Sequence, residues 1–183
     1  MNKTLYIIAG ANGSGKTTFA KSYSEIKHLY FINADEIAKN IDPLNYNKHQ
    51  IKAGKEFFAQ LDAHLTSNES FIIETTLSGK YLIEIIKNAK SLNFEVFLIY
   101  LFLSQENENI LRVKNRVLNG GHNVPTEDII RRYYRSRQLF NDVYKNFFDK
   151  WLLFYNGDDK YELVATNNNI MDEELFKLFN EGF

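Results

Sequence analysis

The chain has 183 residues, 44% of them hydrophobic and 25% charged, a composition that excludes a disordered chain and favours one folded domain over residues 1–183. It contains no cysteine, which excludes disulfides, thiolate metal sites and cysteine nucleophiles. The net charge of -1 argues against a molecule whose whole surface attracts nucleic acid or membrane.

The first half of the chain alternates apolar runs with helical patterns. Strands are predicted at Thr4–Ala9, Leu29–Asn33, Ser70–Glu74 and Phe94–Leu103, and helices at Lys16–Glu25, Asn47–Thr66 and Lys80–Ser91. The first and fourth runs are apolar almost throughout, which is typical of strands buried on both faces of a parallel sheet. We therefore predict an α/β fold, with a parallel sheet and helices on both of its faces.

The N-terminal run Leu5–Ala11 follows Lys3 and has the length of a signal-peptide core. No convincing cleavage site follows it, so we interpret the run as the first strand and expect a cytoplasmic protein. No stretch approaches the ~18 apolar residues that a membrane helix needs, and no membrane partner is expected.

The second half begins with helical patterns and ends with two short strands. Helices are predicted at Glu106–Leu118, Glu127–Phe148 and Met171–Phe179, and strands at Trp151–Asn156 and Tyr161–Thr166. In the long helix, an aromatic and aliphatic stripe recurs at helical spacing and should face the core. The stripe consists of Ile129, Tyr133, Phe140, Tyr144 and Phe147.

A phosphate-binding motif separates the first strand from the first helix. Gly10-Ala11-Asn12-Gly13-Ser14-Gly15-Lys16-Thr17 matches the pattern G-x-x-x-x-G-K-[ST]. The loop's backbone N–H groups should surround the phosphates of ATP or GTP, with Thr18 completing the nucleotide-binding set. Lys16 should reach the β- and γ-phosphates, and the Thr17 hydroxyl should ligate Mg²⁺. The motif alone does not distinguish kinases from GTPases or ATPases.

Asp35 follows the second predicted strand and is the candidate general base. In an open α/β sheet, the carboxyl ends of the strands line the ligand crevice. A carboxylate there can accept the proton of a substrate hydroxyl, which favours a hydroxyl acceptor over a phosphate acceptor. The alternative is that Asp35 or Asn33 only caps a helix over Glu36–Asn40.

The third predicted strand ends in Glu74-Thr75-Thr76, where a Walker B carboxylate would stand. Glu74 is expected to bind substrate, or to hold Mg²⁺ through water, and Thr76 to donate a hydrogen bond to the acceptor. The alternative for Glu74 is a salt bridge at the edge of the sheet.

The positive charge is concentrated between Arg112 and Arg137, where seven basic and two acidic residues give +5 and leave the remainder at -6. Arginine forks suit bidentate phosphate binding, although an ordinary solvated helix face is the alternative. Within the segment, Gly120-Gly121 and Pro125 predict a hinge, and we expect a mobile lid over about residues 116–135. We assign Arg116 and Arg132 to catalysis, Arg131 and Arg135 to nucleotide phosphates, and His122 to a substrate or structural contact.

Four motifs together resemble the zeta-toxin-like P-loop kinases of bacteria. They are Gly10–Thr17, Asp35-Glu36, Glu74-Thr75-Thr76, and Arg116 through Gly-Gly-His-Asn-Val-Pro to Arg131-Arg132-Tyr133. The resemblance covers about residues 4–140. It implies a nucleotide-kinase-like P-loop fold with a helical arginine-bearing lid, and ATP or GTP with Mg²⁺ as cofactors.

The characterised toxins of this family phosphorylate a sugar hydroxyl of UDP-N-acetylglucosamine and are held inactive by a small antitoxin. The resemblance therefore implies a nucleotide-sugar acceptor and an antitoxin partner. By position, it assigns the base to Asp35, substrate and metal-shell contacts to Glu74 and Thr76, and the phosphate clamp to the lid arginines.

We therefore predict a kinase that transfers the γ-phosphate of ATP or GTP to a hydroxyl of a small molecule. If the protein is a toxin of this family, the acceptor is a nucleotide sugar. If it is a housekeeping or resistance kinase, the acceptor is another alcohol or sugar. An NTP-dependent switch or ATPase module is the alternative from a different class. A kinase of nucleic-acid ends is disfavoured, because nucleotide phosphates already explain the arginine cluster.

Overall fold

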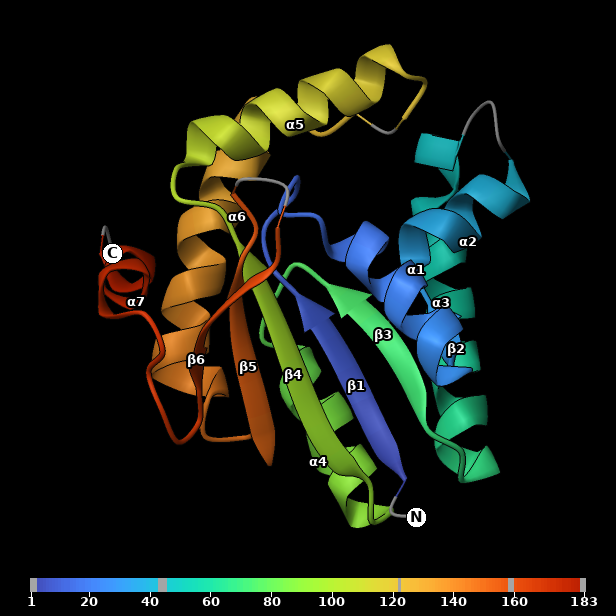
Figure 1. Ribbon diagram of the computed structural model, residues 1–183. Helices are drawn as coiled ribbons and strands as arrows, with labels where there is room; N and C mark the ends of the chain where they lie inside the picture. Colours follow the sequence, from blue (N-terminus) through green and yellow to red (C-terminus); the bar gives the residue numbers. More distant parts are fainter. Residues whose placement is uncertain (1–2, 43–45, 122, 158–159, 182–183) are drawn as a thin grey trace.

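The computed structural model describes residues 3–42, 46–121, 123–157 and 160–181. Its centre is a six-stranded sheet in the order β2-β3-β1-β4-β5-β6 (Figure 1). The strands are β1 (Thr4–Ala9), β2 (Tyr30–Ile32), β3 (Phe71–Thr75), β4 (Glu95–Phe102), β5 (Lys150–Tyr155) and β6 (Glu162–Thr166). The α-helices are α1 (Lys16–Lys27), α2 (Ala34–Ile41), α3 (Gln50–Ser67), α4 (Leu82–Ser91), α5 (Glu106–Leu118), α6 (Thr126–Leu139) and α7 (Glu173–Asn180). These elements confirm the predicted α/β fold.

The sheet is parallel from β2 through β5, and β6 pairs antiparallel with β5 at one edge. The predicted parallel sheet is confirmed for β1 to β5, and the last strand, β6, departs from it. A parallel crossover needs a dozen or more residues, whereas only residues 156–161 separate β5 from β6. The short connection therefore returns the chain as a hairpin.

Both faces of the sheet are covered. In β1, Leu5, Ile7 and Ala9 belong to the large core cluster, to which α3, α4, α6 and α7 contribute. Tyr6 and Ile8 point to the opposite face, which α1 covers. This alternation explains why the strand is apolar in nearly every position.

The predicted helix over Glu127–Phe148 is wrong in its second half. The α-helical part, α6, ends at Leu139, and a π-helical segment η2 follows at Phe140–Tyr144. The Lys145 N–H donates to the carbonyl of Phe140, five residues back, so the wider turn ends the helix before β5. Phe140 and Tyr144 remain buried, as the stripe predicts.

The carboxyl-terminal ends of the central strands meet at one edge of the sheet, and α5 lies across this edge at the top of Figure 1. The chain turns after α5 as predicted, because the Gly121 N–H donates to the carbonyl of Arg116 and α6 begins at Thr126. None of the helices in the described part of the chain is long and apolar enough to cross a membrane.

Candidate active site

The loop between β1 and α1 has the backbone of a phosphate-binding turn. Gly13 and Gly15 have φ angles of 84° and 90°, a region that side-chain-bearing residues rarely adopt. A Cβ on Gly15 would lie 2.2 Å from the Nδ2 atom of Asn156, so the loop packs too closely there for any side chain. Lys16 begins α1 directly behind the loop, so the positive end of the helix faces the same space.

Lys16 is buried inside this loop. Its Nζ donates to the carbonyl of Ala11 at 2.9 Å and lies 3.8 Å from an Oε1 of Glu74. Burial lowers the pKa of the Lys16 ammonium, and the negative charges of Glu74 and Asp35 oppose that shift. The ammonium is therefore desolvated and held by acceptors that a phosphate can replace.

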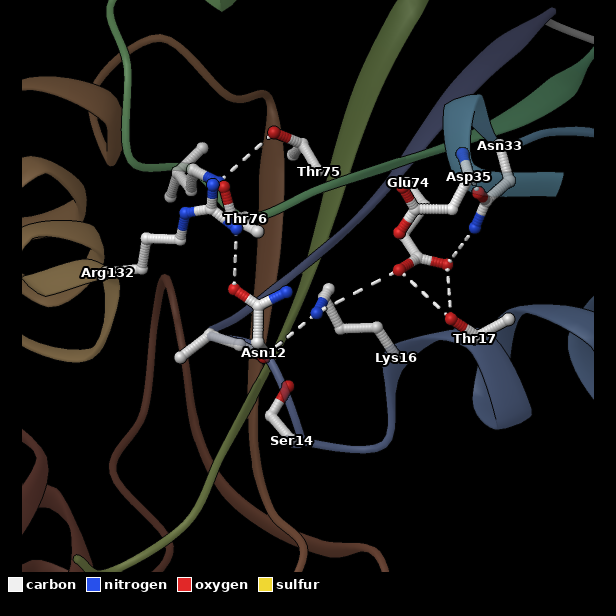
Figure 2. A network of polar contacts seen from close by, with 12 residues as sticks. Asn12, Ser14, Lys16, Thr17, Asn33, Asp35, Glu74, Thr75, Thr76 and Arg132 are labelled. Atoms are coloured by element: carbon white, nitrogen blue, oxygen red, sulfur yellow. Dashed lines mark hydrogen bonds and ion pairs between the residues drawn. The ribbon is translucent and has the colours of Figure 1, made fainter. Parts of the chain in front are cut away.

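Glu74, at the end of β3, gathers hydrogen bonds from two other elements. Its carboxylate accepts from the Thr17 hydroxyl at 2.8 Å and from the Asn33 Nδ2 atom at 2.6 Å (Figure 2). Burial raises the pKa of Glu74, while Lys16 and these two hydrogen bonds oppose the rise. The salt-bridge alternative holds as well, because Glu74 pairs with Lys16, so the ion pair and the predicted site residue belong to the same place.

Asn33, and not Asp35, caps α2. The Asn33 Oδ1 atom accepts from the N–H groups of Asp35 and Glu36, at 2.8 and 3.1 Å. The helix begins at Ala34, so Asp35 lies in its first turn with an exposed side chain. The capping alternative therefore applies to Asn33, and the Asp35 carboxylate faces a cleft.

This cleft has a volume of about 610 Å³ and brings most of the predicted site residues together. Its lining includes Asn12, Gly13, Gly15, Lys16, Thr17, Thr18, Asp35, Glu74, Thr76, Arg112, Arg116, Asn156 and Tyr161. Gly10, Ala11 and Ser14 belong to the same loop but do not line the cleft.

The predicted lid arginines separate into two groups. Arg116 lines the cleft. Arg132 does not line it, but its NH1 atom donates to the Oδ1 atom of Asn12, a cleft residue, at 2.9 Å, and the charges of both arginines lower the pKa of Lys16. Arg131 and Arg135 have exposed side chains outside the cleft lining, and Arg131 pairs with Asp128 at 2.6 Å. His122 lies outside the described residues.

Three residues that line the cleft were not among the predicted site residues. The Arg112 NH2 atom donates to the carbonyls of Asn156 and Gly157, both at 2.8 Å, and the Asn156 Nδ2 atom donates to the carbonyl of Ser14 at 3.0 Å. Tyr161 lines the cleft from the segment between β5 and β6. The basic segment included Arg112, but no motif marked Asn156 or Tyr161, because only the hairpin brings them to the loop.

The Thr17 hydroxyl and the Glu74 carboxylate form an adjacent pair of oxygen donors. In the parts of the chain that the structure describes, no group of three His, Asp or Glu residues could hold a metal ion by itself. Mg²⁺ in nucleotide sites keeps several waters and takes few protein ligands besides the phosphates. The two donors therefore fit a magnesium ion that arrives with the nucleotide.

A family model described as "Zeta toxin" matches residues 1–169. This chain belongs to the zeta toxin family. An uncharacterized protein of Haemophilus influenzae is 35% identical over 133 residues, which cover 73% of this chain and 93% of that protein. The resemblance found in the motifs is thereby confirmed.

Solved structures of lower identity share the fold of this chain. The PezAT toxin–antitoxin system of Streptococcus pneumoniae gives a TM-score of 0.66 at 16% identity, covering 100% of this chain and 80% of that one. The AvrRxo1-ORF1:AvrRxo1-ORF2 complex with ATP gives 0.76 at 16% identity, covering 96% of this chain and 63% of that one. Together with the P-loop, family membership supports a nucleotide-dependent phosphotransferase.

Proposed function

We propose that this protein transfers the γ-phosphate of ATP to a hydroxyl group of a small molecule. The observation that carries the proposal is that Asp35 lines the same cleft as Lys16 and Thr17. Because Asn33 caps α2, the Asp35 carboxylate is not used for the helix cap. A P-loop without a carboxylate beside it would suit a nucleotide switch equally well, whereas hydroxyl transfer needs a proton acceptor.

The donor half of the reaction uses the loop and the lid. The ammonium of Lys16 leaves the carbonyl of Ala11 and binds the β- and γ-phosphates, where its charge opposes the negative charge of the transition state. Arg116 and Arg132 add positive charge from the lid. Magnesium, when bound with the nucleotide, neutralises charge on the same phosphates.

The acceptor half uses the ends of β2 and β3. The acceptor oxygen forms a bond to the γ-phosphorus as the bond to the β-phosphate oxygen breaks, and its proton passes to the Asp35 carboxylate. Thr76 lines the cleft and orients the acceptor by a hydrogen bond. Glu74 accepts a hydrogen bond from the Thr17 hydroxyl, so it orients this hydroxyl and would hold magnesium beside it, directly or through water.

A nucleotide sugar, with UDP-N-acetylglucosamine first, is the acceptor that family membership favours. Family membership also favours a small antitoxin protein as partner, since the pneumococcal relative of similar fold comes from a toxin–antitoxin system. If the acceptor is another alcohol or sugar, the same residues would transfer the phosphoryl group by the same chemistry.

The test is a transfer assay with labelled ATP, Mg²⁺ and a panel of nucleotide sugars, nucleosides and small alcohols, read by mass spectrometry. We expect one acceptor to gain a phosphoryl group, and we expect no gain with Asp35→Asn. A gain on an alcohol other than a nucleotide sugar would keep the kinase and remove the toxin assignment. ATP binding without transfer to any acceptor would instead favour a switch.

A further inference from the structure

We propose that Asn12, inside the phosphate loop, is a positioning residue that holds Arg132 over the place of the γ-phosphate. The Asn12 Oδ1 atom accepts from the Arg132 NH1 atom at 2.9 Å, across 120 residues of sequence (Figure 2). Phosphate loops bind through their backbone, and the motif leaves this position open to any residue. The inference rests on the proposed function, because it gives Arg132 a phosphate to bind.

Asn12 is fixed before it contacts Arg132. Its side chain is 8% exposed, and its own carbonyl accepts from the Asn109 Nδ2 atom of α5 at 2.7 Å. Asn109 is itself 1% exposed. The amide therefore presents its oxygen from a fixed position, and Asn12 joins the phosphate loop to α5 through Asn109 and to α6 through Arg132.

The chemistry of the pair preserves the charge of the arginine. A guanidinium has only donors, so the amide must present its oxygen to Arg132, and the other N–H groups remain for further acceptors. Because the amide is neutral, it orients the cation without neutralising it. A carboxylate at the place of the amide would form a close ion pair and compete with the phosphate, whereas the nearby Asp128 carboxylate lies 3.8 Å from Arg132 and pairs more closely with Arg131, at 2.6 Å.

Arg132 is also placed for the phosphate. It contacts Asn12, a residue that lines the cleft beside Lys16, and its positive charge is near enough to lower the pKa of Lys16. The second terminal nitrogen lies 3.8 Å from a carboxylate oxygen of Asp128, one turn back on α6, which supports the side chain from the other side. A long side chain that is already ordered loses less entropy when the nucleotide binds.

The experiment is a double-mutant cycle with Asn12→Ala, Arg132→Ala and both together, using calorimetric affinities for ATP and ADP with Mg²⁺. ADP lacks the γ-phosphate, so it reports the integrity of the loop alone. We expect each single variant to weaken ATP binding by about tenfold and to leave ADP binding within about twofold. The double variant should bind ATP no more weakly than Arg132→Ala.

The matched control is Asn109→Ala, which removes the support of the Asn12 backbone without removing the amide that contacts Arg132. A structural role for Asn12 would make Asn12→Ala weaken ATP and ADP equally, as loosening the loop through Asn109→Ala should. Equal losses in Asn12→Ala, losses that multiply in the double variant, or unchanged ATP affinity would each overturn the proposal.

Two further arrangements keep the test decisive. If Asn12→Ala does not fold, Asn12→Ser replaces it, since a serine hydroxyl is too short to span to Arg132. The affinities need no acceptor, so the proposed positioning can succeed even where the transfer assay fails. Transfer without any Asn12–Arg132 coupling would remove the positioning and leave the kinase.

Discussion

At the site, side chains with the same functional group have different roles. Asn33 uses its oxygen to cap α2 and its nitrogen to bind Glu74, so one amide joins β2, α2 and β3. Asp35 and Glu74 are both carboxylates, yet Glu74 is buried against Thr17 while Asp35 is exposed to the cleft. At the residue scale, burial and hydrogen bonding therefore assign different roles to the same functional group.

Lys16→Ala should lower phosphoryl transfer by at least about a hundredfold, because a preorganised cation at the transferring phosphate is lost. The measurement is turnover of labelled ATP with the acceptor that the panel identifies. Lys27→Ala, near the other end of α1, is the matched control and should retain activity. A Lys16→Ala protein with near-normal turnover would contradict the phosphate assignment.

Asp35→Asn should stop transfer while ATP affinity stays within a few-fold, because an amide cannot accept the proton but contributes little to nucleotide binding. Transfer rate and ATP affinity are measured on the same preparation. Glu36→Gln changes the adjacent carboxylate, which pairs with Lys21, and should leave transfer intact. Retained transfer in Asp35→Asn would remove the base assignment.

At the scale of elements, α7 is held to the sheet by a buried arginine among aromatic rings. Arg137 is 2% exposed, its guanidinium lies 3.9 Å from the ring centre of Tyr133, and its NH1 atom donates to the carbonyl of Leu178 at 3.2 Å. Phe179 packs against Phe102 with ring centres 5.0 Å apart. One arginine of the basic segment is therefore part of the core and unavailable for phosphate.

Phe179→Ala should lower the free energy of unfolding by about 3–5 kcal/mol, since it empties a fully buried ring position. In a domain of this size the melting temperature should fall by roughly 10 °C. Calorimetry measures both quantities. Lys177→Ala, on the exposed side of the same helix, should change stability by less than about 0.5 kcal/mol. Equal effects of the two variants would show that α7 is not docked.

Asp149 joins α4 to β4 and supplies a pH-dependent part of the stability. Burial raises the pKa of its carboxyl, but the hydrogen bonds from Lys90 and the Val96 N–H outweigh burial, and the pKa lies below its ordinary value. A lowered folded-state pKa means that the contribution is fully present above about pH 4 and is lost as the pH falls through the lowered value.

Asp149→Asn should therefore lower the free energy of unfolding by about 0.5 kcal/mol at neutral pH, because solvent screens this partly exposed carboxylate, and the difference from the wild type should shrink in acid. Urea titrations at a series of pH values measure it. A difference that grew as the pH fell would have the wrong sign for this assignment.

At the scale of the whole molecule, the site depends on elements that meet only at the carboxyl edge of the sheet. The P-loop, the ends of β2 and β3, α5, α6 and the start of the β5–β6 connection each contribute a side chain to the cleft or to its contacts. The basic segment is distributed accordingly, with Arg112 and Arg116 at the cleft and Arg137 in the core. Ligand binding should consequently stabilise the entire domain.

ATP with Mg²⁺ at about a hundred times its dissociation constant should stabilise the fold by about 2.7 kcal/mol. The melting temperature should rise by roughly 5–10 °C. Differential scanning calorimetry measures this rise. Lys16→Ala, tested at the same nucleotide concentration, should lose most of the rise. An equal rise in that variant would place the nucleotide elsewhere.

Much of the fold could be predicted from the pattern of apolar residues in the sequence, because strands buried on both faces are apolar in nearly every position. The predicted boundaries of β1 and α5 are confirmed, and those of β4 are confirmed to within one residue. The direction of β6 and the end of α6 were not readable. The first depends on a connection too short for a crossover, and the second on a wider helical turn that local propensity does not mark.

The sequence by itself determined the P-loop, its strand and helix, and the carboxylates that follow the next two strands, because these depend on local spacing. Only the tertiary structure decided that Asn33 caps α2, that Arg132 meets Asn12 while Arg131 and Arg135 face outward, and that Asn156 reaches Ser14. The Arg132–Asn12 and Asn156–Ser14 contacts join residues far apart in the chain. Their partners are selected by packing, which no local pattern records.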